Sequence, residues 1–365
     1  MSTLFHIFNS IQNTLFPWLE EALDPLSEKE QKFVQVLSVM DLETHMKAYR
    51  WKGKGRKRKN RLSMAKAFVA KAIYNFETTD ILIDYLRGCK NTRRLCGWEN
   101  PWQVPSKSTF SRAFAQFSEG NLTQDIHQAM VKEHCGEKLA GHISRDSTAI
   151  AAREKPAKKK SDDSVAQPKR KPGRPRKGEV VAPKPPKRLD LQPTRSLEDN
   201  LKDLPTQCDV GTKKNSKGYK ESWIGYKLHL DCIDGDIPVS TLLTSASLHD
   251  SQAAIPLSQM SQERITNLYD LMDSAYDAPQ IHSFSKNLGH KPIIDHNPRR
   301  GEKIYMDPAT KARFAQRSSA ERVNSYLKDN YGGRNIRVKG AAKVMTHLMF
   351  GIIAITATQL FRLLE

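Results

Sequence analysis

Three acidic residues, Asp146, Asp273 and Glu321, are far apart in the chain but stand where carboxylates could converge. Asp146 lies in the middle or at the exit of the short predicted strand HISRDSTAI (142–150), and Asp273 follows the apolar run of TNLYDLMDSAYD (266–277). Glu321 lies in a predicted helix. Three carboxylates suit two Mg²⁺ ions about 3.5–4 Å apart, and Mn²⁺ accepts the same oxygen ligands. The three acids therefore predict a two-metal site for phosphoryl transfer, which needs no covalent nucleophile.

Each acid also has an ordinary structural interpretation. Asp146 could be a turn or cap residue. Asp273 competes with Asp270 and Asp277, either of which could cap the next helix, although its position directly after the apolar run favours Asp273. Glu321 could form an exposed ion pair with the arginine four residues before it. The order of the three acids and the elements that carry them favour a joint role.

The helix that carries Glu321 is predicted over residues 307–329, DPATKARFAQRSSAERVNSYLKD. It begins with an Asp N-cap followed by Pro, and a Gly pair stops the chain beyond it. One stripe of this helix contains, at i, i+3, i+7 and i+14, Phe314, Arg317, Glu321 and Lys328. One carboxylate between two cations suits a face that holds metal through Glu321 and phosphate through Arg317 and Lys328.

The surrounding segments predict an α/β catalytic domain over residues 139–365. The Asp234-Gly235 turn joins two of its strands into a hairpin. The order of strand, hairpin, helix, strand, strand and helix is that of a ribonuclease-H-like fold, and open α/β sheets place their sites at strand carboxyl ends. The predicted strands are 142–150, 222–234, 236–247, 266–273 and 291–300, and the predicted helices include 251–262 and 341–364.

Residues 1–138 predict an all-α DNA-binding domain. Helical patterns alternate there with turn and capping signals. Ser106 caps a helix that carries Lys107 and Arg112, and this helix with its predecessor is similar to a helix-turn-helix that reads DNA. A plain helical bundle is the alternative interpretation of the same pattern.

The net charge of +19 is concentrated in two segments. Residues 50–61 contain eight Lys and Arg and no acid, and residues 151–190 contain fourteen Lys and Arg against five acids. Such segments beside ordinary globular domains indicate a polyanion, most simply nucleic acid, although solubilising linkers share this composition. In the first segment, phosphate contacts are predicted for Arg56, Lys57, Arg58 and Lys59.

The second basic segment lies in an insert, residues 153–205, that interrupts the catalytic domain. It is rich in Lys and Pro and poor in aliphatic residues, so it predicts disorder. Its KRKPGRPRKG run resembles an AT-hook, in which Arg174, Pro175 and Arg176 lie extended in an A·T minor groove. A basic Pro-rich linker is the alternative.

Five cysteines without a C-x-x-C pair, and an N-terminus without a signal-peptide pattern, fit a reducing cytosol. The apolar run 348–360 is thirteen residues long, which is short for a membrane span and typical of a buried helix. No membrane association is expected.

The sequence resembles the DDE transposases of bacterial insertion sequences, the cut-and-paste class with a Tyr-x2-Arg-x3-Glu-x6-Lys signature. This chain has Phe, Arg, Glu and Lys at the same spacing, from Phe314 to Lys328. RDSTAI around Asp146 and MDSAYD around Asp273 are similar to the family's first two acidic motifs. The resemblance covers roughly residues 141–364 apart from the insert, and the helical segment before it is similar to the domain that binds DNA ends in such enzymes.

This resemblance implies a transposase that binds the inverted-repeat ends of its element, cleaves them and joins their 3′-hydroxyls to target DNA. It implies two Mg²⁺ ions per active site and double-stranded DNA as partner, both transposon ends and target. Two ends imply a homodimer on DNA, in the bacterial cytoplasm at the nucleoid. The alternatives are a metal-dependent nuclease of the same fold without strand transfer and a non-catalytic, domesticated DNA-binding protein.

The sequence also departs from this family. Phe314 replaces the signature Tyr and removes a hydroxyl that could bond phosphate. Only 47 residues separate Asp273 from Glu321, too few for the large β insertion of some relatives. No Trp follows Trp223, so the resemblance does not extend to the hairpin DNA intermediate that a stacking Trp supports in some relatives.

Overall fold

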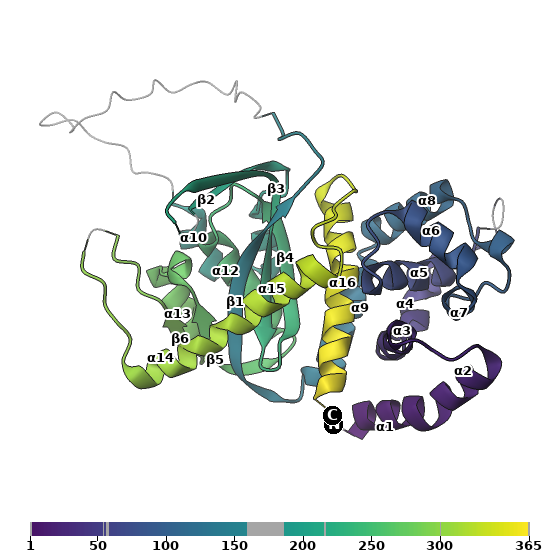
Figure 1. Ribbon diagram of the computed structural model, residues 1–365. Helices are drawn as coiled ribbons and strands as arrows, with labels where there is room; N and C mark the ends of the chain where they lie inside the picture. The colour runs from purple at the N-terminus through teal and green to yellow at the C-terminus, as the bar shows by residue number, and fades with distance from the viewer. Residues whose placement is uncertain are drawn as a thin grey trace, which may run out of the picture.

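The computed structural model describes residues 2–53, 55, 58–158, 186–214, 217–299 and 301–363. Its helical first part and its mixed sheet lie on opposite sides of one long helix, α16 (Ala341–Arg362), as Figure 1 shows. The two parts predicted from the sequence are therefore joined through an element of the second part.

The chain before the first strand is helical, as its patterns predict. The Ser27 side chain accepts a hydrogen bond from the Glu30 amide while the Glu30 carboxylate accepts one from the Ser27 amide, which fixes the start of α3. The helices of this part are α1 (Ser2–Ser10), α2 (Phe16–Ala22), α3 (Glu28–Val39), α4 (Leu42–His45), α5 (Arg61–Ile73), α6 (Thr79–Gly88), α7 (Lys90–Leu95), α8 (Lys107–Glu119) and α9 (Leu122–Cys135).

The sheet has the strand arrangement expected of a ribonuclease-H-like domain. Its main path is β2-β3-β1-β5-β6, and β4 pairs with β3. β1 is antiparallel to β3 and parallel to β5, and β5 is parallel to β6. The predicted hairpin is formed by β3 and β4. The strands are β1 (Leu139–Ala151), β2 (Asp209–Lys214), β3 (Lys220–Ile233), β4 (Ile237–Ser245), β5 (Thr266–Met272) and β6 (Lys291–Ile294).

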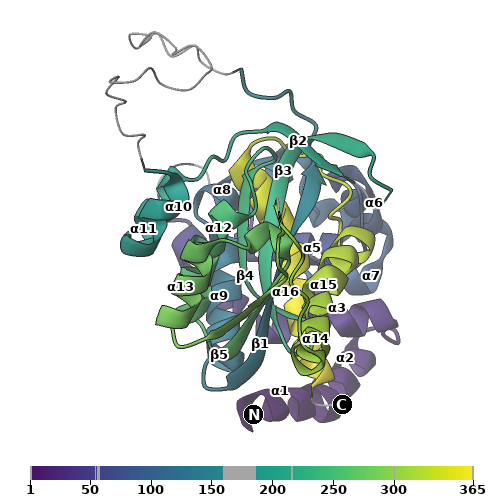
Figure 2. The same ribbon diagram turned by 90° about the vertical axis from the view of Figure 1, so that its left-hand side faces the viewer.

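Helices cover both faces of this sheet. α12 (Ser251–Gln262) packs on β3 and β4 and beside α13 (Pro279–Asn287). On the other face, α16 packs on β4, and α15 (Ser318–Asn330) lies across β1 and β3 (Figures 1 and 2). α14 (Pro308–Phe314) precedes α15.

Two short helices correct the expectation of a disordered insert over 153–205. Residues Arg188–Leu191 form α10 and residues Leu197–Asp203 form α11. Buried amides hold them on α12, because the Asn200 side chain donates to Gln259 at 2.9 Å and the Gln192 side chain donates to the Gln252 carbonyl at 2.7 Å. The sequence did not indicate these few buried contacts because the basic, Pro-rich composition of the insert is typical of disorder. Residues 159–185, including the hook-like Arg174, Pro175 and Arg176, lie outside the described residues.

The helix predicted over 307–329 is interrupted. Asp307 caps α14 by accepting from the Thr310 amide at 3.0 Å, as predicted. A 3₁₀ turn, Ala315–Arg317, then separates α14 from α15. This tighter turn alters the angular spacing on which the single stripe depends.

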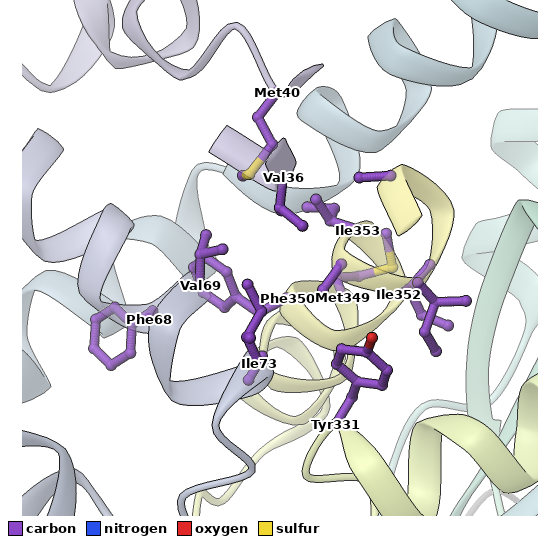
Figure 3. Close-up of a cluster of buried hydrophobic side chains, with 14 of the residues drawn as sticks. Val36, Met40, Phe68, Val69, Ile73, Tyr331, Met349, Phe350, Ile352 and Ile353 are labelled. Carbon is purple, nitrogen blue, oxygen red and sulfur yellow. The ribbon is translucent and has the colours of Figure 1, made fainter. Parts of the chain in front are cut away.

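α16 forms the centre of one hydrophobic core shared by the helical part and the sheet. Figure 3 shows Met349, Phe350 and Ile353 beside Val36 and Val69 from α3 and α5. α16 is long and apolar enough to span a membrane by composition, but 89% of its apolar window is buried inside the protein. It therefore serves as a core helix, as the sequence indicates.

Two glycines allow close approaches that position the site. Gly225 has φ +151°, and a Cβ there would lie 2.1 Å from the Ile150 carbonyl oxygen, where β3 passes β1. A Cβ at Gly351 would lie 2.7 Å from a Leu327 methyl and 2.8 Å from the Tyr331 carbonyl oxygen. Gly351 therefore lets α15 dock closely on α16.

Candidate active site

Asp146 lies in the middle of β1, opposite Leu230 of β3. Because side chains alternate along a strand, Asp146 and its neighbour Arg145 point to opposite faces of the sheet. Asp146 points toward α15, where the Asn324 amide donates to its Oδ2 at 3.0 Å. Arg145 is buried on the other face and donates twice to Asp231, with both distances 2.7 Å. One strand thus carries a candidate functional acid directly beside a structural ion pair.

Asp273 immediately follows β5 and caps a short turn by accepting from the Ala275 amide at 3.0 Å. The parallel register pairs Ser144 of β1 with Leu271 of β5. Asp146 and Asp273 each lie two residues further along the chain than this pair. The register therefore places the two acids at the same height along the sheet.

The two acids affect each other electrostatically. Burial and, to a smaller extent, the Asp273 carboxylate raise the pKa of Asp146, the Arg317 guanidinium opposes them, and the result is about 6. Burial also raises the pKa of Asp273, an effect opposed by its bond to the Ala275 amide and by Arg317 and increased by Asp250. Burial and mutual repulsion therefore disfavour the ionised forms of these two carboxyl groups.

We expect wild-type protein in cation-free buffer to lose stability as the pH rises from about 4 to 6. The folded pKa of Asp146, about 6, exceeds an unfolded value of about 3.9, so the folded state binds more protons in this window. Asp146→Asn removes this pH dependence and should be more stable by about 3 kcal/mol at pH 7. Urea denaturation of both proteins between pH 4 and 7.5 measures the difference, and parallel curves would contradict it.

The competing acids next to Asp273 have structural partners. The Asp270 carboxylate is buried and accepts from Ser285 and from Asn267. The Asp277 carboxylate accepts from the Asn297 amide at 2.9 Å and contacts His282 at 2.9 Å. These contacts leave Asp273 as the candidate functional acid of this segment.

Glu321 does not join the two aspartates in this structure. Its carboxylate accepts a hydrogen bond from Arg317, and its side chain is 52% exposed. Among the described residues, no three His, Cys, Asp or Glu side chains form a group that could hold a metal ion. Arg317 links Glu321 to the two aspartates. It donates a hydrogen bond to Glu321, and its charge opposes the rise in pKa of both Asp146 and Asp273.

The other predicted members of the helical stripe lie near the acids or near Arg317. The Lys328 ammonium donates to Thr148 of β1 at 2.6 Å. The Phe314 ring, whose position carries no hydroxyl, lies 5.6 Å from the Arg317 guanidinium. Asn324 was not predicted, although it lies three residues after Glu321 and four before Lys328 on the same face. That helical spacing could have indicated Asn324 as a residue of the site.

The donor set fits a hard cation. Asp146 and Asp273 offer carboxylate oxygens whose pKa values are raised. The Asn324 Oδ1 atom is buried without a hydrogen-bond partner, and amide oxygens are ordinary ligands of such ions. A cation here would offset the repulsion between the two acids.

Four of the residues of the helical part that are predicted to contact DNA are described, and all four are exposed: Arg58, Lys59, Lys107 and Arg112. Lys107 forms an ion pair with Asp80, and Arg112 donates to the Ser108 carbonyl at 3.3 Å. Both lie on α8, which follows α6 and α7. Arg58 and Lys59 precede α5, whereas Arg56 and Lys57 lie outside the described residues.

The mixed sheet with helices on both faces fits the ribonuclease-H-like domain of DDE enzymes. Residues 182–357 match the family model described as Transposase DDE domain, and residues 21–116 match the model described as Transposase domain (DUF772). The chain belongs to the DDE transposases of insertion sequences. Membership implies DNA as substrate. The first match contains Asp273 and Glu321 but begins after Asp146. No curated protein gives a significant match.

Proposed function

We propose that this transposase binds the inverted-repeat ends of its element, cleaves them, and joins the freed 3′-hydroxyls to target DNA. One observation supports this most strongly: Asp146 in β1 and Asp273, directly after the neighbouring parallel strand β5, lie at the same height along the sheet, and burial raises both pKa values. Such a pair is suited to a cation and a phosphodiester rather than to packing.

In this proposal Asp146 and Asp273 hold Mg²⁺, or Mn²⁺, with two ions per active site. Bound divalent ions would activate the attacking oxygen and stabilise the leaving oxygen. Glu321 is the proposed third carboxylate, and it would reach the aspartates by leaving Arg317. The cost of the exchange is modest because the Glu321 side chain is 52% exposed, and a solvent-accessible ion pair within one helix stabilises by only about 0–1 kcal/mol.

The cations of α15 and its preceding turn act on DNA in the same proposal. When Glu321 turns toward the acids, Arg317 is free to bond a phosphate at the end of the element. Lys328 donates to the neighbouring phosphate in place of Thr148, and Phe314 packs against the DNA or the Arg317 guanidinium. Each of these contacts orients the phosphodiester over Asp146 and Asp273.

The remaining parts of the proposal concern assembly. Two ends need two active sites, so the active species is a homodimer on DNA, in the bacterial cytoplasm at the nucleoid. Contacts to the ends come from α8, with Lys107 and Arg112, and from the basic segment before α5. The hook-like Arg174-Pro175-Arg176 core adds affinity for A·T-rich DNA.

A strand-transfer assay with pre-cut ends tests this function. The wild-type protein, Mg²⁺, a duplex ending in the terminal repeat that flanks the gene, and a plasmid target should give joined products. Cleavage of uncut ends without joining would instead identify a nuclease. Absence of both, with DNA binding retained, would identify a DNA-binding protein that has no catalytic role.

A further inference from the structure

A cavity of about 560 Å³, whose lining includes none of the three acids, lies between α5, α6 and α8 on one side and residues 331–347 on the other. Its lining includes the side chains of Phe68, Phe114 and Phe350. The segment 331–347 contains the connection between α15 and α16 and the start of α16, so the cavity is built from both parts of the chain.

The walls of this cavity are strongly cationic. Its two acids are already paired: Glu77 with Arg337 at 3.1 Å, and Asp80 with Lys107. The remaining charged groups are all positive. The six cationic side chains that line the cavity are Lys71, Lys107, Arg153, Arg337, Lys339 and Lys343. Cations therefore exceed acids by four in this one hollow.

Lys71 is the most buried of these cations, with only 9% of the residue exposed. Within the described part of the chain its ammonium has one weak hydrogen bond, to the Glu77 carbonyl at 3.4 Å. Burial and the Arg337 charge lower the pKa of Lys71, against an opposing effect of the Glu77 carboxylate, and the result is about 8. His347, which also lines the cavity, has a pKa lowered to about 4 by burial and by Lys71, so it is neutral and supplies no negative charge. A buried ammonium with so little compensation is costly unless an anion completes its shell.

We propose that this cavity binds a phosphate group of the DNA backbone, with Lys71 and Arg337 as its principal cations. The inference rests on the proposed function only in taking DNA as the ligand. A planar guanidinium and an ammonium group that line one cavity match the hydrogen-bonding and charge requirements of a phosphodiester.

The position of the cavity favours DNA over a free phosphate compound. Asn324, which bonds Asp146, and Tyr331, which lines the cavity, are seven residues apart along α15 and its end. That separation is about 10 Å along a helix, or about three base-pair steps of duplex DNA. One DNA segment can therefore contact the acids and the cavity together.

The test compares Lys71→Met with Lys66→Met. Both lysines lie on α5, but Lys66 does not line the cavity. Fluorescence anisotropy with a fixed duplex DNA, over a series of salt concentrations, gives the affinity and its salt dependence. We expect Lys71→Met to weaken binding about tenfold and to reduce the magnitude of the salt slope by about 0.9, as for one lost phosphate contact. Lys66→Met should match wild type.

Thermal unfolding without DNA separates a ligand contact from a structural role. Removing an undercompensated buried charge while keeping the aliphatic stem should leave the Tm of Lys71→Met unchanged or raise it. A lowered Tm, or DNA binding equal to wild type, overturns the proposal. A rise in Tm with inorganic pyrophosphate, combined with unchanged DNA affinity, would also overturn it and assign the cavity to small phosphates.

Failure of the cavity proposal and failure of the proposed function can be distinguished. The Lys71→Met test measures DNA affinity and thermal unfolding alone, so its result is read without any cleavage or joining. A wild-type protein that neither cleaves nor joins DNA refutes the proposed function whatever the binding data show.

Discussion

Asp146→Asn and Asp273→Asn should each reduce DNA cleavage by about a thousandfold or more. An amide keeps the size of the carboxyl group but removes the negative charge that holds a divalent ion. Stabilisation by such ions contributes several kcal/mol to phosphoryl transfer, and each 1.4 kcal/mol is tenfold in rate. Cleavage of end-containing DNA in Mg²⁺ measures the loss.

Asp329→Asn is the matched control. Asp329 is on α15, half-exposed and paired with Arg334, so the same change in charge should leave cleavage within about twofold, as for ordinary surface substitutions. DNA binding by both catalytic-site variants should persist. Cleavage retained by Asp146→Asn would exclude the site, and an unchanged cellular effect of that variant would favour a non-catalytic protein.

Arg145→Met should lower the free energy of unfolding by about 3–5 kcal/mol, the largest effect on stability expected here. The change removes the arginine partner of the Asp231 carboxylate. This carboxylate is fully buried and also accepts a hydrogen bond from Ser261 at 2.7 Å. Breaking one side of a buried ion pair is costly because an uncompensated charge remains. Urea denaturation at pH 7 measures this loss.

Two comparisons identify the cause of that loss. Arg322→Met breaks a bidentate pair with Asp236 at the surface, where the arginine side chain is 55% exposed, and should cost no more than about 1 kcal/mol. Adding Asp231→Leu to Arg145→Met should recover much of the loss by removing the stranded charge. Equal costs for the two arginine variants would contradict this account.

Much of the sheet could be predicted from the sequence because its signals are local. Alternating side chains, the Asp234-Gly235 turn and the apolar run before Asp273 correctly indicated β3, β4 and β5. The order of these elements indicated the fold class. β2 was missed because Asp209–Lys214 is polar and short, and it is a strand only because β3 pairs with it.

The site was less predictable because it depends on contacts between distant residues. The level placement of Asp146 and Asp273 follows from strand register, which the fold class implied. The bond from Asn324 to Asp146 and the position of Glu321 depend on the turn at Ala315–Arg317, which no pattern in the helix indicated. The pairing of Arg145 with Asp231 was hidden for the same reason, since a charged residue in a strand does not reveal its partner.

Locating Mn²⁺ by its anomalous diffraction in crystals of the protein bound to end DNA shows directly whether Asp146 and Asp273 hold the metal. We expect manganese bound by the carboxylates of both Asp146 and Asp273, with Glu321 released from Arg317 as the third acid. Manganese held by Asp146, Asp273 and Asn324 instead would retain the site and remove Glu321 from it. Manganese bound elsewhere, or none beside these two aspartates at a saturating concentration, would contradict the account.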